Sequence, residues 1–187
     1  MVRVLAGELH VWIVPLDRPT PEIERLHALL SAQEQARAGS FPLPPRKRRY
    51  VARQGAVREI LAGYTARDPS ELEIIRRDRG KPALASGVPS FSVSDSHDLA
   101  LVAVGDCELG VDVERVVERP AARRMGTLEA FYEAWTAREA AGKATGEGLF
   151  AAPAQGHWRS WRIAPAPGFL ATLVAERGAR RVSLRTH

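Results

Sequence analysis

The sequence contains very little cysteine and no long apolar run, and both absences limit what the protein can be. Cys107 is the single cysteine among 187 residues, so the chain cannot hold an internal disulfide framework. A lone thiol is typical of proteins in a reducing compartment, and we expect a cytoplasmic location. No segment approaches the roughly 18 consecutive apolar residues that a membrane-spanning helix needs, so we expect no membrane partner. Because Arg3, Glu8 and His10 interrupt the run at 2–14, that run predicts a strand and not a signal peptide.

The overall composition also lacks a strong bias. Hydrophobic residues make up 45% of the chain and charged residues 26%, as in ordinary globular proteins, and the length suits one domain or two small lobes. The five histidines share no ligand spacing, so we predict no histidine metal site. The net charge of +5 indicates an anionic partner. The sharpest basic run, at 46–49, has an alternative interpretation as the solvated face of a helix.

Four helices are predicted from apolar spacing and from residues typical of helix ends. Thr20 has the character of an N-cap, and Ser31 with Glu34 forms the pattern of a capping box. Gly63 is expected to end the third helix, whose arginines should all stay exposed. The predicted helices lie at 20–30, from 31 onward, at 46–62 and at 121–144.

Strands alternate with these helices in mixed order. The segments 99–104 and 109–114 are expected to pair as a hairpin around the turn at Gly105-Asp106. Mainly antiparallel strands together with helices predict an α+β fold. The remaining predicted strands lie at 2–14, 72–76, 91–94, 158–163, 168–176 and 181–185.

Two short acidic motifs give the clearest chemical signal. Residues 110–114 read Gly-Val-Asp-Val-Glu, so on a strand Asp112 and Glu114 project from one face. Residues 135–143 read Trp-Thr-Ala-Arg-Glu-Ala-Ala-Gly-Lys, which places Glu139 and Lys143 on one face of a helix. Three carboxylates with a nearby ammonium suit a Mg²⁺ ion that holds phosphate oxygens. The alternatives are a solvated strand edge and a surface ion pair.

Taken together, the two motifs resemble the signature of the Sfp-type 4′-phosphopantetheinyl transferases. Further family-like segments occur in the family's order at 48–53, 80–82, 91–96 and 168–173. The resemblance implies a Mg²⁺-dependent transfer of the 4′-phosphopantetheine arm from coenzyme A to a serine of an apo acyl or peptidyl carrier protein, with release of 3′,5′-ADP.

The resemblance also implies a role for particular residues. Asp112, Glu114 and Glu139 would hold Mg²⁺; Glu139 is in addition the candidate base for the incoming serine. Lys143 would contact the phosphate or the leaving group. The residues implied in binding coenzyme A are Arg48, Arg49, Arg53, Lys81, Ser94 and position 95, which is Asp95 here.

The sequence departs from the family pattern in three places. Asp95 stands where the family usually has a phosphate-binding histidine, Arg138 replaces the usual lysine before Glu139, and the segment 115–134 is shorter. A carboxylate beside a pyrophosphate repels it, so the second hypothesis is a coenzyme A-binding homologue with reduced or lost transferase activity. A third, a basic nucleic-acid-binding protein, is disfavoured because no recognised binding motif is present and the carboxylates cluster. We expect no nucleic-acid partner.

The resemblance finally implies an architecture. The family fold consists of two similar α+β lobes related by a pseudo-twofold axis, with a nucleotide cleft between them. On this chain the lobes would comprise residues 1–105 and 106–187, and the protein would be a monomer.

Overall fold

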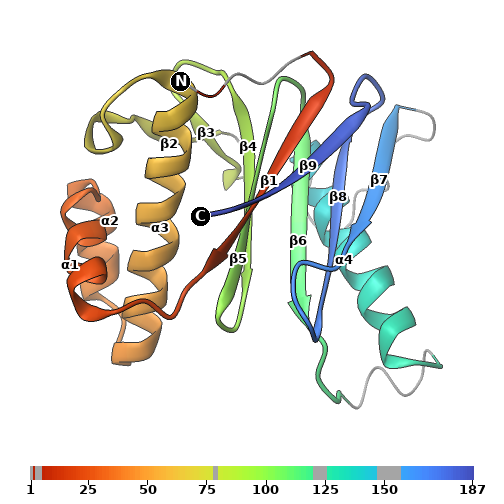
Figure 1. Cartoon of the computed structure of the whole chain (residues 1–187), viewed down its shortest axis with the longest axis horizontal. Helices are drawn as coiled ribbons and strands as arrows, with labels where there is room; N and C mark the ends of the chain where they lie inside the picture. Colours follow the sequence, from red (N-terminus) through yellow and green to blue (C-terminus); the bar gives the residue numbers. More distant parts are fainter. Residues whose placement is uncertain (1, 3–5, 78–79, 120–125, 147–156) are drawn as a thin grey trace.

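The computed structural model describes residues 2, 6–77, 80–119, 126–146 and 157–187, and it has a mixed α and β architecture (Figure 1). One sheet has four strands in the order β4-β5-β1-β9, a second has three in the order β6-β8-β7, and β2 and β3 form a short ribbon. This mixture agrees with the predicted α+β class. The strands are β1 (Glu8–Pro15), β2 (Ile74–Arg76), β3 (Pro82–Leu84), β4 (Ser90–Ser96), β5 (Leu99–Gly105), β6 (Leu109–Arg115), β7 (Trp158–Ile163), β8 (Phe169–Glu176) and β9 (Arg181–Thr186).

The two sheets face each other; the helices that follow β1 cover the outer side of the four-stranded sheet, and the helix that precedes β7 covers the outer side of the three-stranded sheet (Figure 1). Leu101 of the four-stranded sheet and Leu173 of the three-stranded sheet belong to one buried cluster between them. A second cluster joins the four-stranded sheet to the helices that follow β1, and a third joins α4 to Val174. The helices are α1 (Thr20–Ala28), α2 (Ala32–Gly39), α3 (Pro44–Thr65) and α4 (Leu128–Thr145), with a 3-10 turn at Pro69–Glu71.

Strand β5 shows why these layers form. All of its residues are buried, and they alternate between the two clusters, with Leu101 and Ala103 on one side and Val102 and Val104 on the other. A strand covered on both faces has an almost continuous apolar sequence, as this one does.

The predicted hairpin between 99–104 and 109–114 is wrong. Strand β5 pairs with β1 and β4, whereas β6 pairs antiparallel with β8 in the other sheet. The chain crosses between sheets at Gly105, where a Cβ atom would lie 2.6 Å from the Leu9 side chain and 2.8 Å from that of Leu109. A side chain here would have to displace both buried leucines, so the glycine suits the close packing of the two sheets at this crossing.

The last strand returns to the first sheet. Strand β9 pairs in parallel with β1, for example Leu184 with Val11, whereas β7 and β8 join β6. The three C-terminal strands predicted from the sequence therefore exist but divide between two sheets. The lobe ranges 1–105 and 106–187, and the twofold relation between the lobes, stay predictions.

The helix ends partly follow the predictions. The capping box is confirmed, because Ser31 Oγ accepts the Glu34 N–H and Glu34 Oε2 accepts the Ser31 N–H. Thr20 is already the first helical residue and makes no cap, and α3 continues past Gly63 to Thr65. Helix α4 begins at Leu128, behind the capping hydroxyl of Thr127, so the start predicted at 121 is too early; residues 120–125 lie outside the described part of the chain.

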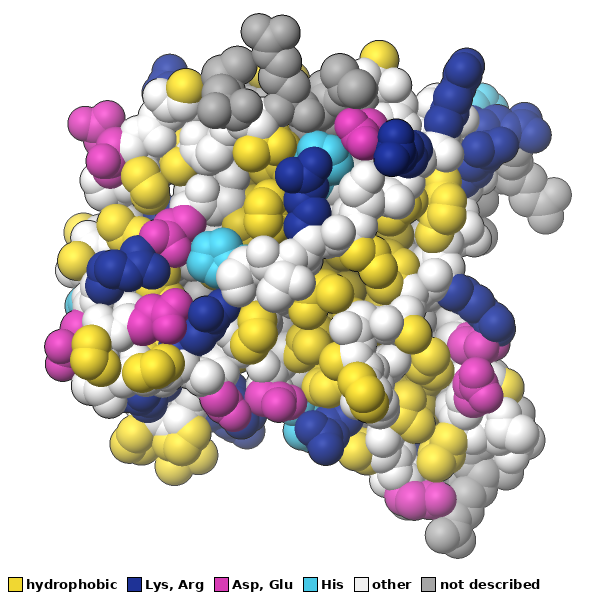
Figure 2. Space-filling view, in the orientation of Figure 1, with side chains coloured by type: hydrophobic (Ala, Val, Ile, Leu, Met, Phe, Trp, Pro, Cys, Tyr) yellow, Lys and Arg dark blue, Asp and Glu magenta, His cyan; other side chains and the backbone are white. Residues whose placement is uncertain are grey.

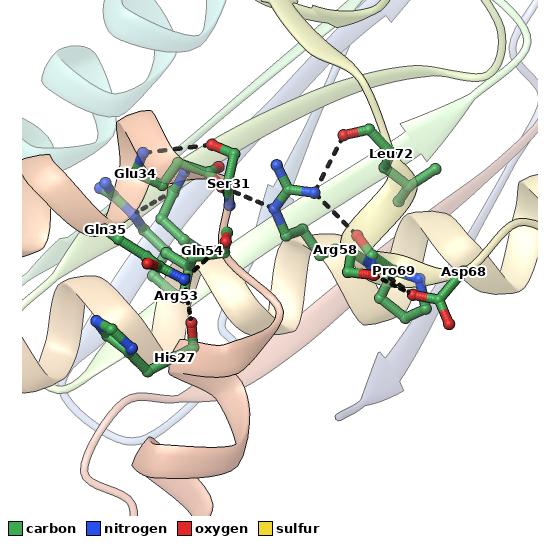
Figure 3. Close-up of polar contacts among 12 residues, drawn as sticks. His27, Ser31, Glu34, Gln35, Arg53, Gln54, Arg58, Asp68, Pro69 and Leu72 are labelled. Carbon is green, nitrogen blue, oxygen red and sulfur yellow. Dashed lines mark hydrogen bonds and ion pairs between the residues drawn. The ribbon is translucent and has the colours of Figure 1, made fainter.

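The prediction that every arginine of α3 stays exposed is also wrong. Arg58 is only 2% exposed and donates from Nε to Glu34 Oε2 at 2.7 Å (Figure 3). Its Nη1 donates to the carbonyl oxygens of Pro69 and Leu72 at 2.9 and 3.0 Å. Gln54 donates to the other oxygen of Glu34. The capping-box carboxylate of α2 thus also neutralises a buried cation, which locks α2, α3 and the following turn together.

The surface in Figure 2 reflects the layered core. Hydrophobic side chains gather over the strands in the middle of this face, and charged side chains of both signs lie mainly around its periphery. Within the described part of the chain, no helix is both long and apolar enough to cross a membrane.

Candidate active site

The candidate site forms where β6 lies against both α4 and β4. Gly110, the first residue of the Gly-Val-Asp-Val-Glu motif, allows the close approach of α4. A Cβ atom at position 110 would lie 2.2 Å from the Ala140 carbonyl oxygen and 2.4 Å from the Ala144 nitrogen. The backbone of α4 therefore rests directly on the strand. A buried hydroxyl pair, Thr136 with Thr172 at 2.8 Å, holds the same helix on β8.

Three serines of β4 face the open edge of β6. Ser92 Oγ accepts the Val111 N–H at 3.1 Å, Ser94 Oγ donates to Asp112 Oδ1 at 2.8 Å, and Ser96 Oγ donates to Glu114 Oε2 at 2.9 Å. Alternate residues of a strand share one face, so the serines lie in phase with the two carboxylates. Two of the serine hydroxyls thereby orient the acidic side chains of the motif.

The two motifs meet at Asp112. Lys143 Nζ donates to Asp112 Oδ1 at 2.7 Å and to Ser94 Oγ at 2.9 Å. The side chain of Asp112 is 7% exposed and that of Lys143 is 32% exposed. Burial of a carboxylate is costly without a compensating cation, and Lys143 supplies one. The other oxygen, Asp112 Oδ2, is buried and has no hydrogen-bond partner within the described residues.

Glu139 completes the acidic group. Burial raises the pKa of Glu139, the charges of Asp112 and Glu114 raise it further, and Lys143 and Arg138 oppose the change. Because Asp112 and Glu114 repel a charge on Glu139, and Asp112 Oδ2 has no hydrogen-bond partner among the described residues, a cation is favourable here.

The chemistry of this group fits a divalent ion in part. All donors are carboxylate or hydroxyl oxygens, which Mg²⁺ prefers. Within the described part of the chain, no three His, Cys, Asp or Glu side chains stand close enough to form a complete ligand cluster. Since Mg²⁺ is commonly bound by one or two carboxylates with substrate phosphates and water, an incomplete protein set is sufficient.

Asp95 lies on the other face of β4. It forms an ion pair with Arg53 of α3, and the Arg53 guanidinium also lies 5.4 Å from the centre of the Tyr50 ring. Ser94 and Ser96, its neighbours, point instead toward β6. The carboxylate that replaces the family's histidine is therefore neutralised on the α3 side, away from Asp112.

The other predicted basic residues are engaged in polar contacts. Arg49 makes a two-pronged pair with Asp17 at 2.8 and 3.0 Å, and Arg48 donates to the Arg18 carbonyl oxygen at 2.8 Å. Lys81, whose side chain is 12% exposed, pairs with Glu108 and donates to the Ala144 carbonyl oxygen at 2.9 Å. Lys81 thus lies at the C-terminal end of α4, where it contacts Ala144, the residue after Lys143, whereas Arg48 and Arg49 contact the segment between β1 and α1.

The sequence alone assigns no role to two residues of the site, Gly110 and Ser96, or to Ser92, which only joins β4 to the backbone of β6. The signal for the serines was present, because the alternation Ser-Val-Ser-Asp-Ser has the same period as Asp-Val-Glu. What the sequence lacked was the information that these two strands lie side by side.

No protein-family model matches the chain, but two known proteins resemble it. The 4′-phosphopantetheinyl transferase HetI of Nostoc sp. (strain PCC 7120) is 34% identical, and the match covers 79% of this chain and 73% of HetI. The protein slr0495 of Synechocystis sp. (strain PCC 6803), provisionally named a 4′-phosphopantetheinyl transferase, is 32% identical over 74% of this chain and 65% of its own length.

Proposed function

The chain belongs to the family of 4′-phosphopantetheinyl transferases, and from that premise we propose that it modifies carrier proteins. It is a transferase, as the paired motifs predicted. The substrate would be coenzyme A, whose phosphopantetheine arm passes to a serine hydroxyl of an apo acyl or peptidyl carrier protein. The observation that carries the proposal is the contact of Lys143 with both Asp112 and Ser94, because it joins the two motifs and the serine segment in one site.

The acidic residues would hold Mg²⁺ against the pyrophosphate of coenzyme A. Asp112, Glu114 and Glu139 are the candidate ligands, of which one or two would bind the ion directly. Asp112 Oδ2, which has no hydrogen-bond partner among the described residues, supports this role. When bound, the ion would stabilise the negative charge that builds on the phosphates during transfer. Its charge would also relieve the repulsion that raises the pKa of Glu139.

The chain's own residues would assist the proton and the leaving group. Glu139 would accept the proton of the carrier serine as the serine oxygen bonds to the β-phosphorus and the bond to the α-phosphate oxygen breaks. A base with a raised pKa is better matched to proton transfer near neutral pH. Lys143 would donate to the departing 3′,5′-ADP, since about one third of its side chain remains exposed.

The basic residues of α3 and the β2–β3 ribbon would bind the nucleotide end. Arg49 would exchange Asp17 for a phosphate, which costs little because exposed ion pairs contribute about 0–1 kcal/mol. Arg48 and Arg53 would contact phosphate oxygens from the same helix, Arg53 while it stays paired with Asp95, and Lys81 from its place at the C-terminal end of α4. We further propose, from the family resemblance, a two-lobed arrangement with the nucleotide in a cleft between the lobes, and a cytoplasmic monomer.

The alternative, a homologue that binds coenzyme A without transfer, rested chiefly on Asp95. Its carboxylate is paired with Arg53 on the α3 side of β4, and a base beside Asp95 would reduce its repulsion of the pyrophosphate, which supports the active enzyme. The decisive experiment is to incubate the protein with Mg²⁺, coenzyme A and a panel of apo carrier proteins, and to measure the intact mass of each carrier.

A matched pair of variants makes that experiment specific. Asp112→Asn keeps the shape and removes the charge, so transfer should fall by a factor of about 100 or more if Asp112 holds the ion. Asp106→Asn, in the exposed turn before β6, should leave transfer unchanged. Tight coenzyme A binding without modification of any carrier would instead support the inactive homologue.

A further inference from the structure

We propose that Ser96 is a positioning residue of this transferase, which holds Glu114 in the orientation in which that carboxylate binds the divalent ion. The inference rests on the proposed function, because it concerns the same ion. It assigns a role to Ser96, which lies in the family-like segment 91–96 but to which the resemblance gives no role.

Ser96 contacts both the carboxylate of Glu114 and the backbone of β6. Its hydroxyl donates to Glu114 Oε2 at 2.9 Å and accepts the Arg115 N–H at 3.1 Å. His97 Nδ1 lies 3.4 Å from Ser96 Oγ. Ser96 is 9% exposed, so water competes little for this hydroxyl. The backbone of β6 therefore fixes the oxygen of Ser96, and the hydrogen of that hydroxyl fixes one oxygen of Glu114.

Strands β4 and β6 lie in a register that brings two serines of β4 to two carboxylates of β6. Ser94 contacts Asp112 and Ser96 contacts Glu114, and both pairs are separated by 18 residues in the chain. Each of these two serine hydroxyls thus donates a hydrogen bond to one carboxylate of β6. A glutamate side chain loses considerable rotamer freedom when it is fixed, so orientation before the ion arrives should favour ion binding.

Ser92 provides an internal comparison. It lies on the same face of the same strand and accepts a β6 backbone N–H at 3.1 Å, as Ser96 does. The hydrogen bond that Ser92 makes to β6 involves a backbone N–H and no carboxylate. If the Ser96 hydroxyl only holds β4 against β6, removal of the Ser96 hydroxyl and removal of the Ser92 hydroxyl should have the same effect. An effect on the ion should appear only at Ser96.

The test compares Ser96→Ala, Ser96→Thr and Ser92→Ala in the full chain. Mn²⁺ binding in the presence of coenzyme A is followed by electron paramagnetic resonance, and the Mg²⁺ dependence of carrier modification is measured in parallel. Loss of a group that orients a metal ligand typically weakens metal affinity by about 10- to 100-fold. We expect Ser96→Ala to weaken Mn²⁺ binding by about 10-fold, Ser96→Thr to restore it, and Ser92→Ala to bind as the unaltered protein does.

Two results would overturn the inference. Equal Mn²⁺ affinities for Ser96→Ala and Ser92→Ala would reduce Ser96 to a strand contact. So would additivity of Ser96→Ala with Glu114→Gln, because a residue that acts through Glu114 has no further effect once that carboxylate is gone. If the alanine variant does not fold, Ser96→Cys replaces it, since a thiol is a weak donor of similar shape. An unaltered protein that binds no Mn²⁺ and modifies no carrier would overturn the proposed function itself.

Discussion

Replacement of Gly110 by alanine should separate the two motifs without touching any charged group. The added Cβ would lie 2.2 Å from the Ala140 carbonyl oxygen, whereas ordinary van der Waals contact begins at 3.4 Å. The atoms that this Cβ would meet, the Ala140 oxygen and the Ala144 nitrogen among them, belong to the backbone of α4. No side-chain rotation can therefore relieve the clash. The helix as a whole must therefore recede from β6 by roughly 1 Å.

That displacement acts directly on Lys143, which α4 carries. Its Nζ lies 2.7 Å from Asp112 Oδ1 and 2.9 Å from Ser94 Oγ, so a shift of about 1 Å takes both contacts beyond hydrogen-bond range. Glu139 lies one turn away on the same helix and would move too. Misplacement of a catalytic group by about 1 Å can reduce turnover about 100-fold, and the strain of overpacking costs about 1–3 kcal/mol of stability.

Carrier modification and urea unfolding together measure these effects. Gly110→Ala should lose about 100-fold in kcat while still unfolding cooperatively. Gly39→Ala is the matched control, because a Cβ there meets nothing within 4 Å. In a Lys143→Ala background, Gly110→Ala should cost less than it does alone, since both act through one helix face. Wild-type turnover in Gly110→Ala would refute the argument that the glycine sets the helix–strand distance.

Three further predictions follow from the electrostatics. The raised pKa of Glu139 means that the folded protein holds this proton more tightly than the unfolded chain, so stability falls as pH rises from the ordinary carboxylate range through the raised value. Glu139→Gln should therefore raise the melting temperature at neutral pH without added metal while it lowers turnover, and an unchanged melt would contradict this. Asp95→Asn frees Arg53 and should lower the KM for coenzyme A, most clearly at low salt; a higher KM would show that the ion pair positions Arg53 for the nucleotide. Arg58→Met leaves Glu34 uncompensated and should cost about 3–5 kcal/mol in urea unfolding, part of which Glu34→Gln should restore.

Much of the local structure could be predicted because its causes are local. The Ser31–Glu34 capping box depends on residues three apart and formed as expected. The strands at β4, β5, β6 and β8 followed from alternating or continuous apolar residues. The burial of Arg58 could not be predicted, because its partners come from α2 and from the turn at Pro69–Glu71, and helix periodicity does not report what packs on a given face.

The sequence by itself determined the family, the acidic motifs and the phase of each strand. Alternation decides which residues share a face, so Ser94 and Ser96 had to project together and Asp95 oppositely. Only the tertiary structure decided what each face meets: β6 leaves β5 for another sheet, its free edge comes to the serines, and α3 presents Arg53 to Asp95. The physical reason is that periodicity is fixed by backbone geometry within a few residues, whereas the partner of a face depends on how all the layers together bury their apolar surface.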